Sequence, residues 1–174
     1  MLTDRHDAYA LLARLGAAPR LLTHLRLVGE AADALVAAYA GMPLLVDARL
    51  IELGVAVHDA GKIPHPSELD GPGALHEPAG ERLLLAHGVQ PEVARLCVLH
   101  AAWDQPGASL EALSVALADK LWKGQRHAAL ELRVIDSAAA RLGVDRWDVF
   151  ERLDAAFEEI AGAGDDRLAR SRAG

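Results

Sequence analysis

The segment between Pro19 and Gly41 limits the possible folds more than any other part of the chain. It reads RLLTHLRLVGEAADALVAAYA, and its apolar residues recur at spacings of three and four. This periodicity is typical of one apolar face of an α-helix. Proline is favoured in the first turn of a helix and glycine ends one, so both boundaries agree with the period. The segment therefore predicts a long helix whose apolar face must be buried against other elements.

Similar apolar runs, bounded by Pro, Gly or a capping residue, recur along the chain. They predict further helices over residues 4–15, 47–60, 76–88, 91–103 and 109–124, with two more between 125 and 161 that separate near Gly143. Ala and Leu dominate a composition that is 52% hydrophobic and only 4% aromatic, which favours helices over sheets. We therefore expect an all-α, single-domain helical bundle of about seven to eight helices over residues 1–174. Its functional core should cover about residues 20–123, followed by C-terminal helices over 125–161.

Three local features between and after these helices carry expectations of their own. Gly61 is a candidate for the left-handed position that caps the third helix. Residues 61–75 are rich in Pro and Gly and lack periodicity, so we expect a loop with the character of a flexible lid. The last ten or so residues are expected to fray.

Charge and cysteine content exclude several classes of partner. The net charge of −7 gives no general attraction to nucleic acid or to an anionic membrane. The single cysteine, Cys97, forms neither an internal disulfide nor a thiolate zinc site by itself. No apolar stretch approaches the roughly 20 residues that span a bilayer, so we expect a cytoplasmic protein without a membrane partner. Trp103, Trp122 and Trp147 would allow a homodimer, although tryptophans are more often core residues.

Six polar side chains stand inside apolar helical segments, where an unpaired polar group is costly. They are His24, His58, Asp59, His76, His100 and Asp119. Any one such histidine is more often a core or surface residue than a ligand, but the six together form a nitrogen and oxygen donor set. That set suits Fe or Mn best here, with Zn, Ni and Mg as alternatives. Helical bundles build metal sites in this way, each helix projecting a side chain inward. His6, His65, His87 and His127 lie in terminal, loop or polar contexts and are assigned no metal role, although His65 and His127 stay open as substrate contacts.

The order of these residues resembles the HD superfamily of metal-dependent phosphohydrolases. His24 comes first, the adjacent pair His58-Asp59 follows with Ala-Gly-Lys behind it, and Asp119 stands in LADKL on a later apolar helix. The resemblance extends from about Arg20 to Lys123. His76 in HEPAGERLL and His100 in VLHAAW are similar to the extra histidines of family members that hold two metals.

This resemblance implies a dinuclear site and a hydrolytic reaction. His24, His58, Asp59 and Asp119 would hold one divalent metal, and Asp59 would bridge to a second held by His76 and His100. A carboxylate has two oxygens and can bridge, whereas an imidazole offers one free nitrogen. Two such cations, about 3.5–4 Å apart, make hydroxide available near neutral pH and neutralise the phosphate that it attacks. Asp59 and Lys62 would then be the catalytic residues.

The substrate implied is a small phosphorylated molecule, such as a nucleotide or another phosphate monoester or diester. Lys62 is placed to bind a phosphate oxygen, and Lys123 and Arg126 would add positive charge at the mouth of the site. The chain lacks the Glu-Asp pair of the alarmone hydrolases after its doublet, and after His100 it reads AAWDQPGASLEA without a Gly-Tyr-Pro signature. These departures argue against an alarmone and against a cyclic dinucleotide.

Two other functions use the same scaffold. Some relatives of the HD superfamily are di-iron oxygenases, and the same six ligands would serve them. Those oxygenases resemble one another in carrying a Lys shortly after the last metal histidine, whereas His100 is followed by Ala-Ala-Trp-Asp. A sensor or interaction module without catalysis is the third alternative, and it is disfavoured because all six ligands are present.

Overall fold

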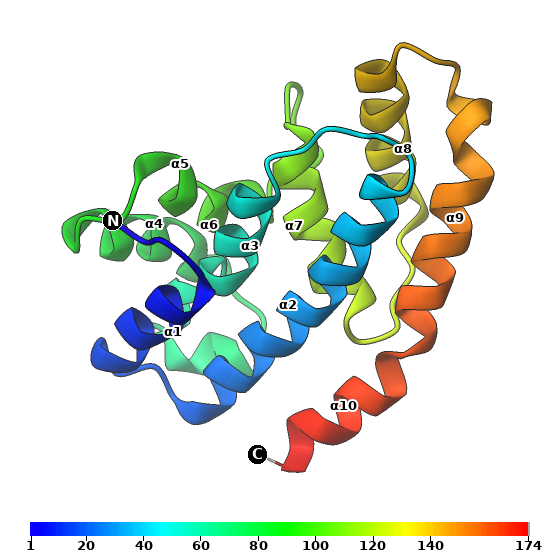
Figure 1. The fold of residues 1–174 in the computed structure, drawn as a ribbon. Coiled ribbons are helices and arrows are strands. Elements are labelled where there is room, and N and C mark those ends of the chain that lie inside the picture. Colours follow the sequence, from blue (N-terminus) through cyan, green and yellow to red (C-terminus); the bar gives the residue numbers. More distant parts are fainter. Residues whose placement is uncertain (174) are drawn as a thin grey trace.

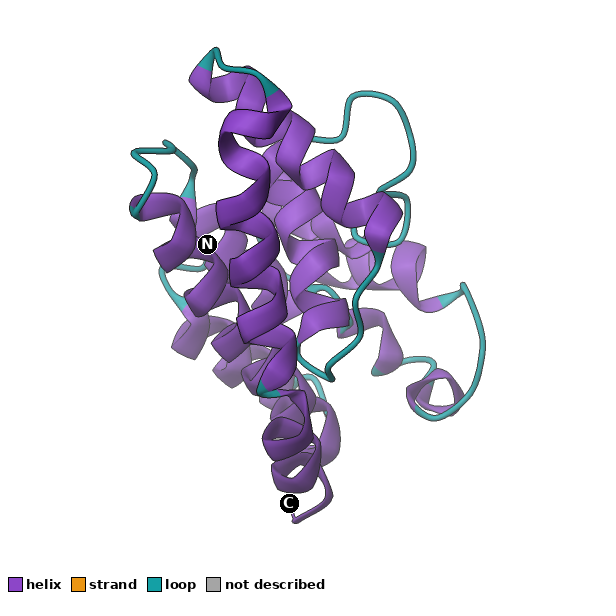
Figure 2. Cartoon of the chain, turned by 90° about the vertical axis from the view of Figure 1, so that its right-hand side faces the viewer, coloured by secondary structure: helices purple, strands orange, loops and turns teal. Residues whose placement is uncertain are grey.

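The computed structural model describes residues 1–173, and within that range the secondary structure is helical without a strand (Figure 2). The predicted all-α fold is therefore confirmed. Eight helices have ten residues or more: α1 (Arg5–Arg14), α2 (Pro19–Ala40), α3 (Ala48–Val57), α4 (His76–Ala86), α7 (Leu110–Leu121), α8 (Ala128–Leu142), α9 (Arg146–Gly162) and α10 (Gly164–Ala173). The shorter ones are α5 (Pro91–Ala94), α6 (Leu96–Leu99) and the 3₁₀ helices η1 (Ala60–Lys62) and η2 (Pro66–Leu69). No helix among residues 1–173 is long and apolar enough to cross a membrane.

Local capping chemistry sets the ends of the main helices. Pro19 begins α2, as the sequence predicts. The Asp47 side chain accepts a hydrogen bond from Leu50 N at 2.8 Å, which caps the start of α3. The Ser109 hydroxyl accepts one from Ala112 N at 3.2 Å and caps α7 in the same way. Gly143 ends α8 with φ of 70°, a conformation that favours glycine.

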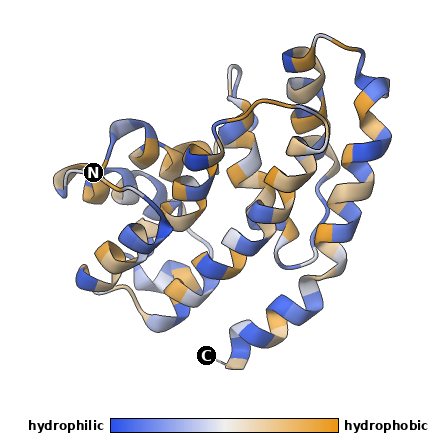
Figure 3. Ribbon diagram, in the orientation of Figure 1, coloured by the Kyte–Doolittle hydropathy of each residue, from blue (hydrophilic) through white to orange (hydrophobic). Residues whose placement is uncertain are grey.

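Helix α2 crosses the molecule diagonally and joins two hydrophobic clusters (Figure 1). The larger cluster packs α2 and α3 against α7, α8 and α9, with Tyr39, Leu117 and Phe157 fully buried. The smaller cluster packs α1 and the start of α2 against α3, α4 and α5, around Leu12 and Leu84. Hydrophilic and hydrophobic residues alternate along the helices of both groups (Figure 3). The ends of α2, α3, α4, α6 and α7 meet between the two clusters.

The segment that follows α3 differs from the predicted loop. Gly61 is not a left-handed cap, because the chain passes directly from α3 into η1 and the φ of Gly61 is not positive. Glycine is required there for another reason: a Cβ on Gly61 would lie 1.7 Å from the His76 carbonyl oxygen. The rest of residues 61–75 is only partly irregular, since η2 forms within it. The lid motion stays a prediction.

Two further expectations were wrong in detail. Residues 91–103 do not form one helix, because Val98 N bonds to Arg95 O, three residues back, and this tighter turn divides α5 from α6. The C-terminal residues do not fray over the described range, since α10 extends to Ala173. Acidic residues in the first turn of α10 and arginines in its last turn favour the helix dipole. Gly174, the last residue of that expectation, lies outside the described residues.

Candidate metal centre

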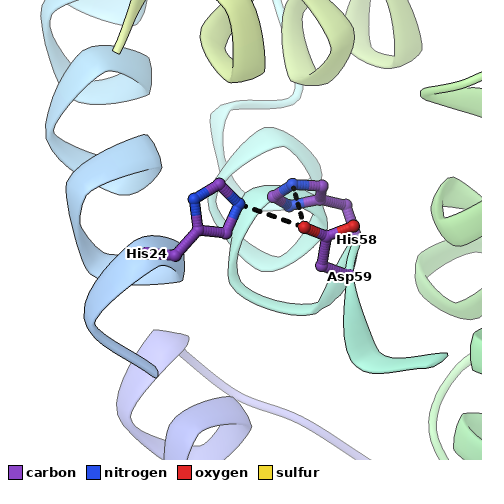
Figure 4. A group of neighbouring side chains, drawn as sticks. All are labelled: His24, His58 and Asp59. Atoms are coloured by element: carbon purple, nitrogen blue, oxygen red, sulfur yellow. Dashed lines mark ion pairs between the residues drawn. The ribbon is translucent and has the colours of Figure 1, made fainter. Parts of the chain in front are cut away.

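The six predicted ligands converge from five helix ends. His24 comes from α2, His58 and Asp59 directly follow α3, His76 begins α4, His100 directly follows α6, and Asp119 lies in the last turn of α7. Figure 4 shows His24 facing the His58-Asp59 pair across the space between α2 and α3. His58 is 0% exposed and Asp59 2% exposed. The structure therefore brings together, in a buried position, side chains that are up to 95 residues apart in sequence, from His24 to Asp119.

Asp59 lies at the centre, and its two oxygens face different histidines. Oδ2 lies 3.1 Å from His24 Nε2 and 3.6 Å from His58 Nε2. Oδ1 lies 3.3 Å from His76 Nε2 and 4.0 Å from His100 Nε2. Asp119 Oδ1 joins the first group, 3.7 Å from His24 Nε2 and 3.5 Å from His58 Nε2. We call His24, His58, Asp119 and Asp59 Oδ2 the first half-site, and His76, His100 and Asp59 Oδ1 the second half-site.

In three of the four imidazoles, Nδ1 makes a hydrogen bond that orients the ring, while Nε2 lies in the site. His58 Nδ1 donates to Val55 O at 2.9 Å, and His100 Nδ1 donates to Leu96 O at 3.2 Å. His76 Nδ1 donates to Glu68 Oε2 at 2.7 Å. A proton fixed on Nδ1 leaves the Nε2 lone pair free to bind a metal. In each case Nε2 faces Asp59.

Glu68 is a functional candidate that the sequence did not reveal. Besides His76 Nδ1, its carboxylate accepts the backbone N–H groups of His76 at 3.0 Å and Leu75 at 3.2 Å. Gly73 leaves room for it, because a Cβ there would lie 2.2 Å from Glu68 Cδ. A carboxylate behind a ligating histidine fixes the ring and increases its basicity. Glu68 stands in a segment without periodicity, so no pattern marked it.

The donor set has bonding capacity that the chain itself does not use. His24 Nε2 and His58 Nε2 are buried and make no hydrogen bond within residues 1–173. Buried polar atoms normally have partners, and unpaired ones require an explanation. A cation between these nitrogens and the facing carboxylates would supply the missing partner. The residues therefore fit a divalent metal of the kind that binds nitrogen and oxygen.

The electrostatics of the cluster agree with this fit. Burial favours a neutral Asp59, but the facing His58 and His24 imidazoles outweigh burial and hold the pKa of Asp59 well below 3.8. Burial is likewise outweighed at Asp119, where His58 lowers the carboxyl pKa. Burial, and then the nearby His58, lower the pKa of His100 to about 4. Metal ligands must be ionised carboxylates and neutral imidazoles, and Asp59, Asp119 and His100 favour those states. At His58 and His76 burial is outweighed by the facing carboxylates, which raise the imidazole pKa, so a cation would bind there in place of a proton.

The cluster opens into a cavity of about 690 Å³, a volume that suits a small-molecule ligand. Lys62 reaches its floor, with Nζ 2.7 Å from Asp59 Oδ2. Lys123 also lines the cavity. Arg126 does not, because its guanidinium is paired with Glu131 at 2.8 Å and Asp154 at 2.5 Å. His65 and His127 do not line the cavity either.

Six further lining residues were not predicted as contacts: Arg20, Leu69, Trp122, Leu168, Ser171 and Arg172. Trp122 packs edge-on against His24 with ring centroids 5.0 Å apart and so restricts that imidazole. Arg172 comes from α10, the segment that was expected to fray.

Comparison with protein families gives one result. The family model described as HD domain matches residues 21–122, more than half of the chain. The search of curated proteins and the search of solved structures gave no match.

Proposed function

The chain belongs to the HD-domain family, and on that premise we propose that it is a metal-dependent phosphohydrolase that cleaves a phosphate ester of a small molecule or nucleotide. The observation that carries this proposal is the convergence at one cavity floor of unpaired imidazole nitrogens, ionised carboxylates and the Lys62 ammonium. Metal ligands alone would suit several kinds of reaction. The Lys62 ammonium beside them favours an anionic substrate.

The two half-sites indicate which residues would hold which metal. His24, His58 and Asp119 would bind one cation and His76 and His100 the other, with Asp59 between them because its oxygens face the two groups separately. Iron and manganese are the best candidates for this donor set. When bound, such cations supply Lewis acidity, which lowers the pKa of a water and neutralises phosphate charge.

Lys62 would bind the reacting phosphate. Its ammonium is a compact donor on a flexible stem, and here it donates to Asp59 Oδ2 at the edge of the first half-site. When the carboxylate is engaged by a cation, the same ammonium is within reach of a phosphate oxygen placed on the cavity floor. Leu69 and Trp122 give the adjoining wall an apolar surface that would exclude water from the organic part of the substrate.

The proposal is tested by metal content and phosphate release together. The protein, purified without a histidine tag, should contain about two equivalents of metal and release phosphate from some members of a panel of nucleotides and sugar phosphates. His58→Ala should lose both properties. His87→Ala is the matched control, because this histidine is exposed and donates only to Leu83 O in its own helix.

Absence of metal from the purified protein, or metal content unchanged in His58→Ala, would contradict the metal assignment. Two irons with oxygen uptake after reduction, but without phosphate release, would favour the oxygenase alternative instead.

A further inference from the structure

One wall of the cavity comes from α10, which lies outside the range that the HD-domain model matches. Leu168, Ser171 and Arg172 line the cavity. Their spacing of three and four residues places them on one face of the helix. The wall they form thus lies outside the part of the chain that the family model covers, and it adds a cation, a hydroxyl group and an apolar side chain to the cavity.

Helix α10 is anchored in this position by several contacts. Arg170 forms two hydrogen bonds with Glu30 of α2, at 2.8 and 2.7 Å. Arg167 is 6% exposed and donates to Ile160 O at 2.8 Å. Gly164 packs on Gly124 so closely that a Cβ would lie 2.3 Å from Gly124 N. Figure 1 shows α10 at the lower right, below the middle of α2.

The cations of the cavity fall into two groups. Lys62 contacts Asp59 at the half-sites. Arg20 precedes His24 by four residues on α2, which is about 6 Å along a helix axis. Lys123 follows Asp119 by four residues, just beyond the end of α7. With Arg172 on α10, these residues form a second group, the outer cations.

The outer cations lack strong internal partners. Within residues 1–173, no carboxylate lies within ion-pair distance of Lys123 or Arg172. Arg20 pairs with Asp70 at 2.5 Å, but both side chains are more than half exposed, and such pairs contribute little. A cavity that gathers cations with weak or no internal partners, in a chain of net charge −7, is complementary to an anion at that end.

We propose that the substrate carries a second acidic group, which binds the outer cations while the reacting phosphate lies at the half-sites. This inference rests on the proposed phosphohydrolase function and narrows its substrate class. Leu69, Leu168 and Trp122 line the same cavity and would contact the organic part between the two anionic groups. Among the outer cations, Arg172 would contribute most to the preference for a substrate with a second acidic group, because guanidinium binds carboxylate and phosphate in a bidentate manner.

The test is calorimetric binding to the metal-loaded full chain of two matched pairs of probes. 3-Phosphoglycerate and glycerol 3-phosphate differ only in a carboxylate that replaces a hydroxymethyl group. Fructose 1,6-bisphosphate and fructose 6-phosphate differ only in a second phosphate. In at least one pair the two-anion member should bind about 10-fold more tightly, as expected for charge-assisted hydrogen bonds. The pair that shows the preference identifies the second group as carboxylate or phosphate.

Arg172→Ala should remove this preference and leave the affinity for the one-anion probe unchanged. Arg172 is exposed near the end of α10, so its loss should not unfold the protein. Arg82→Ala, an exposed arginine of α4 outside the cavity, is the control that keeps the preference. Equal affinities within both pairs, or a preference that survives in Arg172→Ala, would overturn the inference.

Phosphate release from the same probes separates the two proposals. Release without any binding preference would uphold the phosphohydrolase and overturn the second anion site. A preference that depends on Arg172, without release from any ester, would support the second anion site and contradict the phosphohydrolase.

Discussion

Helix α7 carries a carboxylate near each end, the buried Glu111 and the largely buried Asp119, and the two have very different partners. Glu111, 7% exposed in the first turn, receives the Arg141 guanidinium at 2.6 and 3.2 Å and Asp47 N at 3.2 Å. Asp119, in the last turn, accepts the Lys120 ammonium on Oδ2 at 3.2 Å, while its Oδ1 faces two imidazole Nε2 atoms that make no hydrogen bond within residues 1–173. Both pKa values are lowered although burial opposes this, so both groups are charged.

This difference distinguishes Glu111, which belongs to a structural ion pair, from Asp119, which belongs to a ligand site. At Glu111 the chain supplies the opposite charge and the directional donors, so nothing is missing. At Asp119 the chain supplies one ammonium, from the partly exposed Lys120, to Oδ2, whereas Oδ1 faces two imidazole nitrogens whose lone pairs leave its charge only partly compensated. A buried charged group is therefore informative about function when its partners are themselves incomplete, and not simply because it is buried.

The strongest test of this contrast compares activity. Asp119→Asn removes a carboxylate charge from the first half-site and should reduce phosphate release by about 100-fold or more, because even losses outside the ligand set typically cost 10–100-fold. Glu111→Gln should leave turnover per folded molecule unchanged. Comparable losses in both variants, measured at saturating metal, would show that the two ends of α7 do not differ in kind.

Metal removal should change the free energy of unfolding through Asp119, the ligand end of α7. A ligand at about 1,000 times its dissociation constant adds about 4 kcal/mol to the free energy of unfolding, so a chelator should lower that free energy by this amount in the wild type. In Asp119→Asn the chelator should have a much smaller effect. Denaturant titration with and without chelator measures the difference, and a wild type insensitive to the chelator would contradict the metal centre.

Glu111→Gln should destabilise the protein by about 2 kcal/mol at pH 7, because hydrogen bonds to charged groups contribute about 1.5–3 kcal/mol and Arg141 is partly exposed. The pKa of Glu111 is lowered from its ordinary 4.5 in the folded state. Its contribution is thus fully present above pH 4.5 and is lost as the pH falls through the folded pKa. Unfolding of both proteins between pH 7 and pH 3 should show the gap closing; a constant gap would exclude the ionic explanation.

The smallest expected effect concerns Glu68. Glu68→Gln keeps an oxygen acceptor but removes the charge behind His76, and it should weaken metal binding at the second half-site about 10-fold. The first half-site should be unaffected. His100→Ala is the reference for complete loss of the second metal with the fold retained. Metal titration followed by elemental analysis distinguishes the three proteins, and an unchanged metal content in His100→Ala would contradict the two-metal assignment.

The sequence predicted the parts of this molecule that depend on local rules. Pro19, Ser109 and Gly143 marked helix ends because their effects act within a turn. The six candidate ligands were recognisable because a polar residue on an apolar helix is exceptional. Their convergence followed from the bundle, in which buried faces must meet.

Features that depend on the approach of distant segments were not predictable in this way. Gly61 resembled a helix cap in the sequence. Glycine is required at this position because the carbonyl oxygen of His76 leaves no room for a Cβ. Arg126 has a position similar to that of Lys123, yet it turns to Glu131 because a buried carboxylate competes for it. The C-terminal position of α10 suggested fraying, yet the helix is held through Arg170 by Glu30, 140 residues away.

The packing of Gly61 on α4 has a consequence for how such a site can diversify. A Cβ on Gly61 would meet His76 O, and a Cβ on Gly80 would lie 2.9 Å from Gly61 N, so the backbone carrying Asp59 and the helix carrying His76 are in direct contact. The spacing of the two half-sites is thereby fixed by main chain, which point mutations at other side chains hardly alter. The wall on α10 has no such constraint, because it can change residue by residue. Selection can therefore change which substrate the α10 wall recognises while the spacing of the two half-sites stays the same.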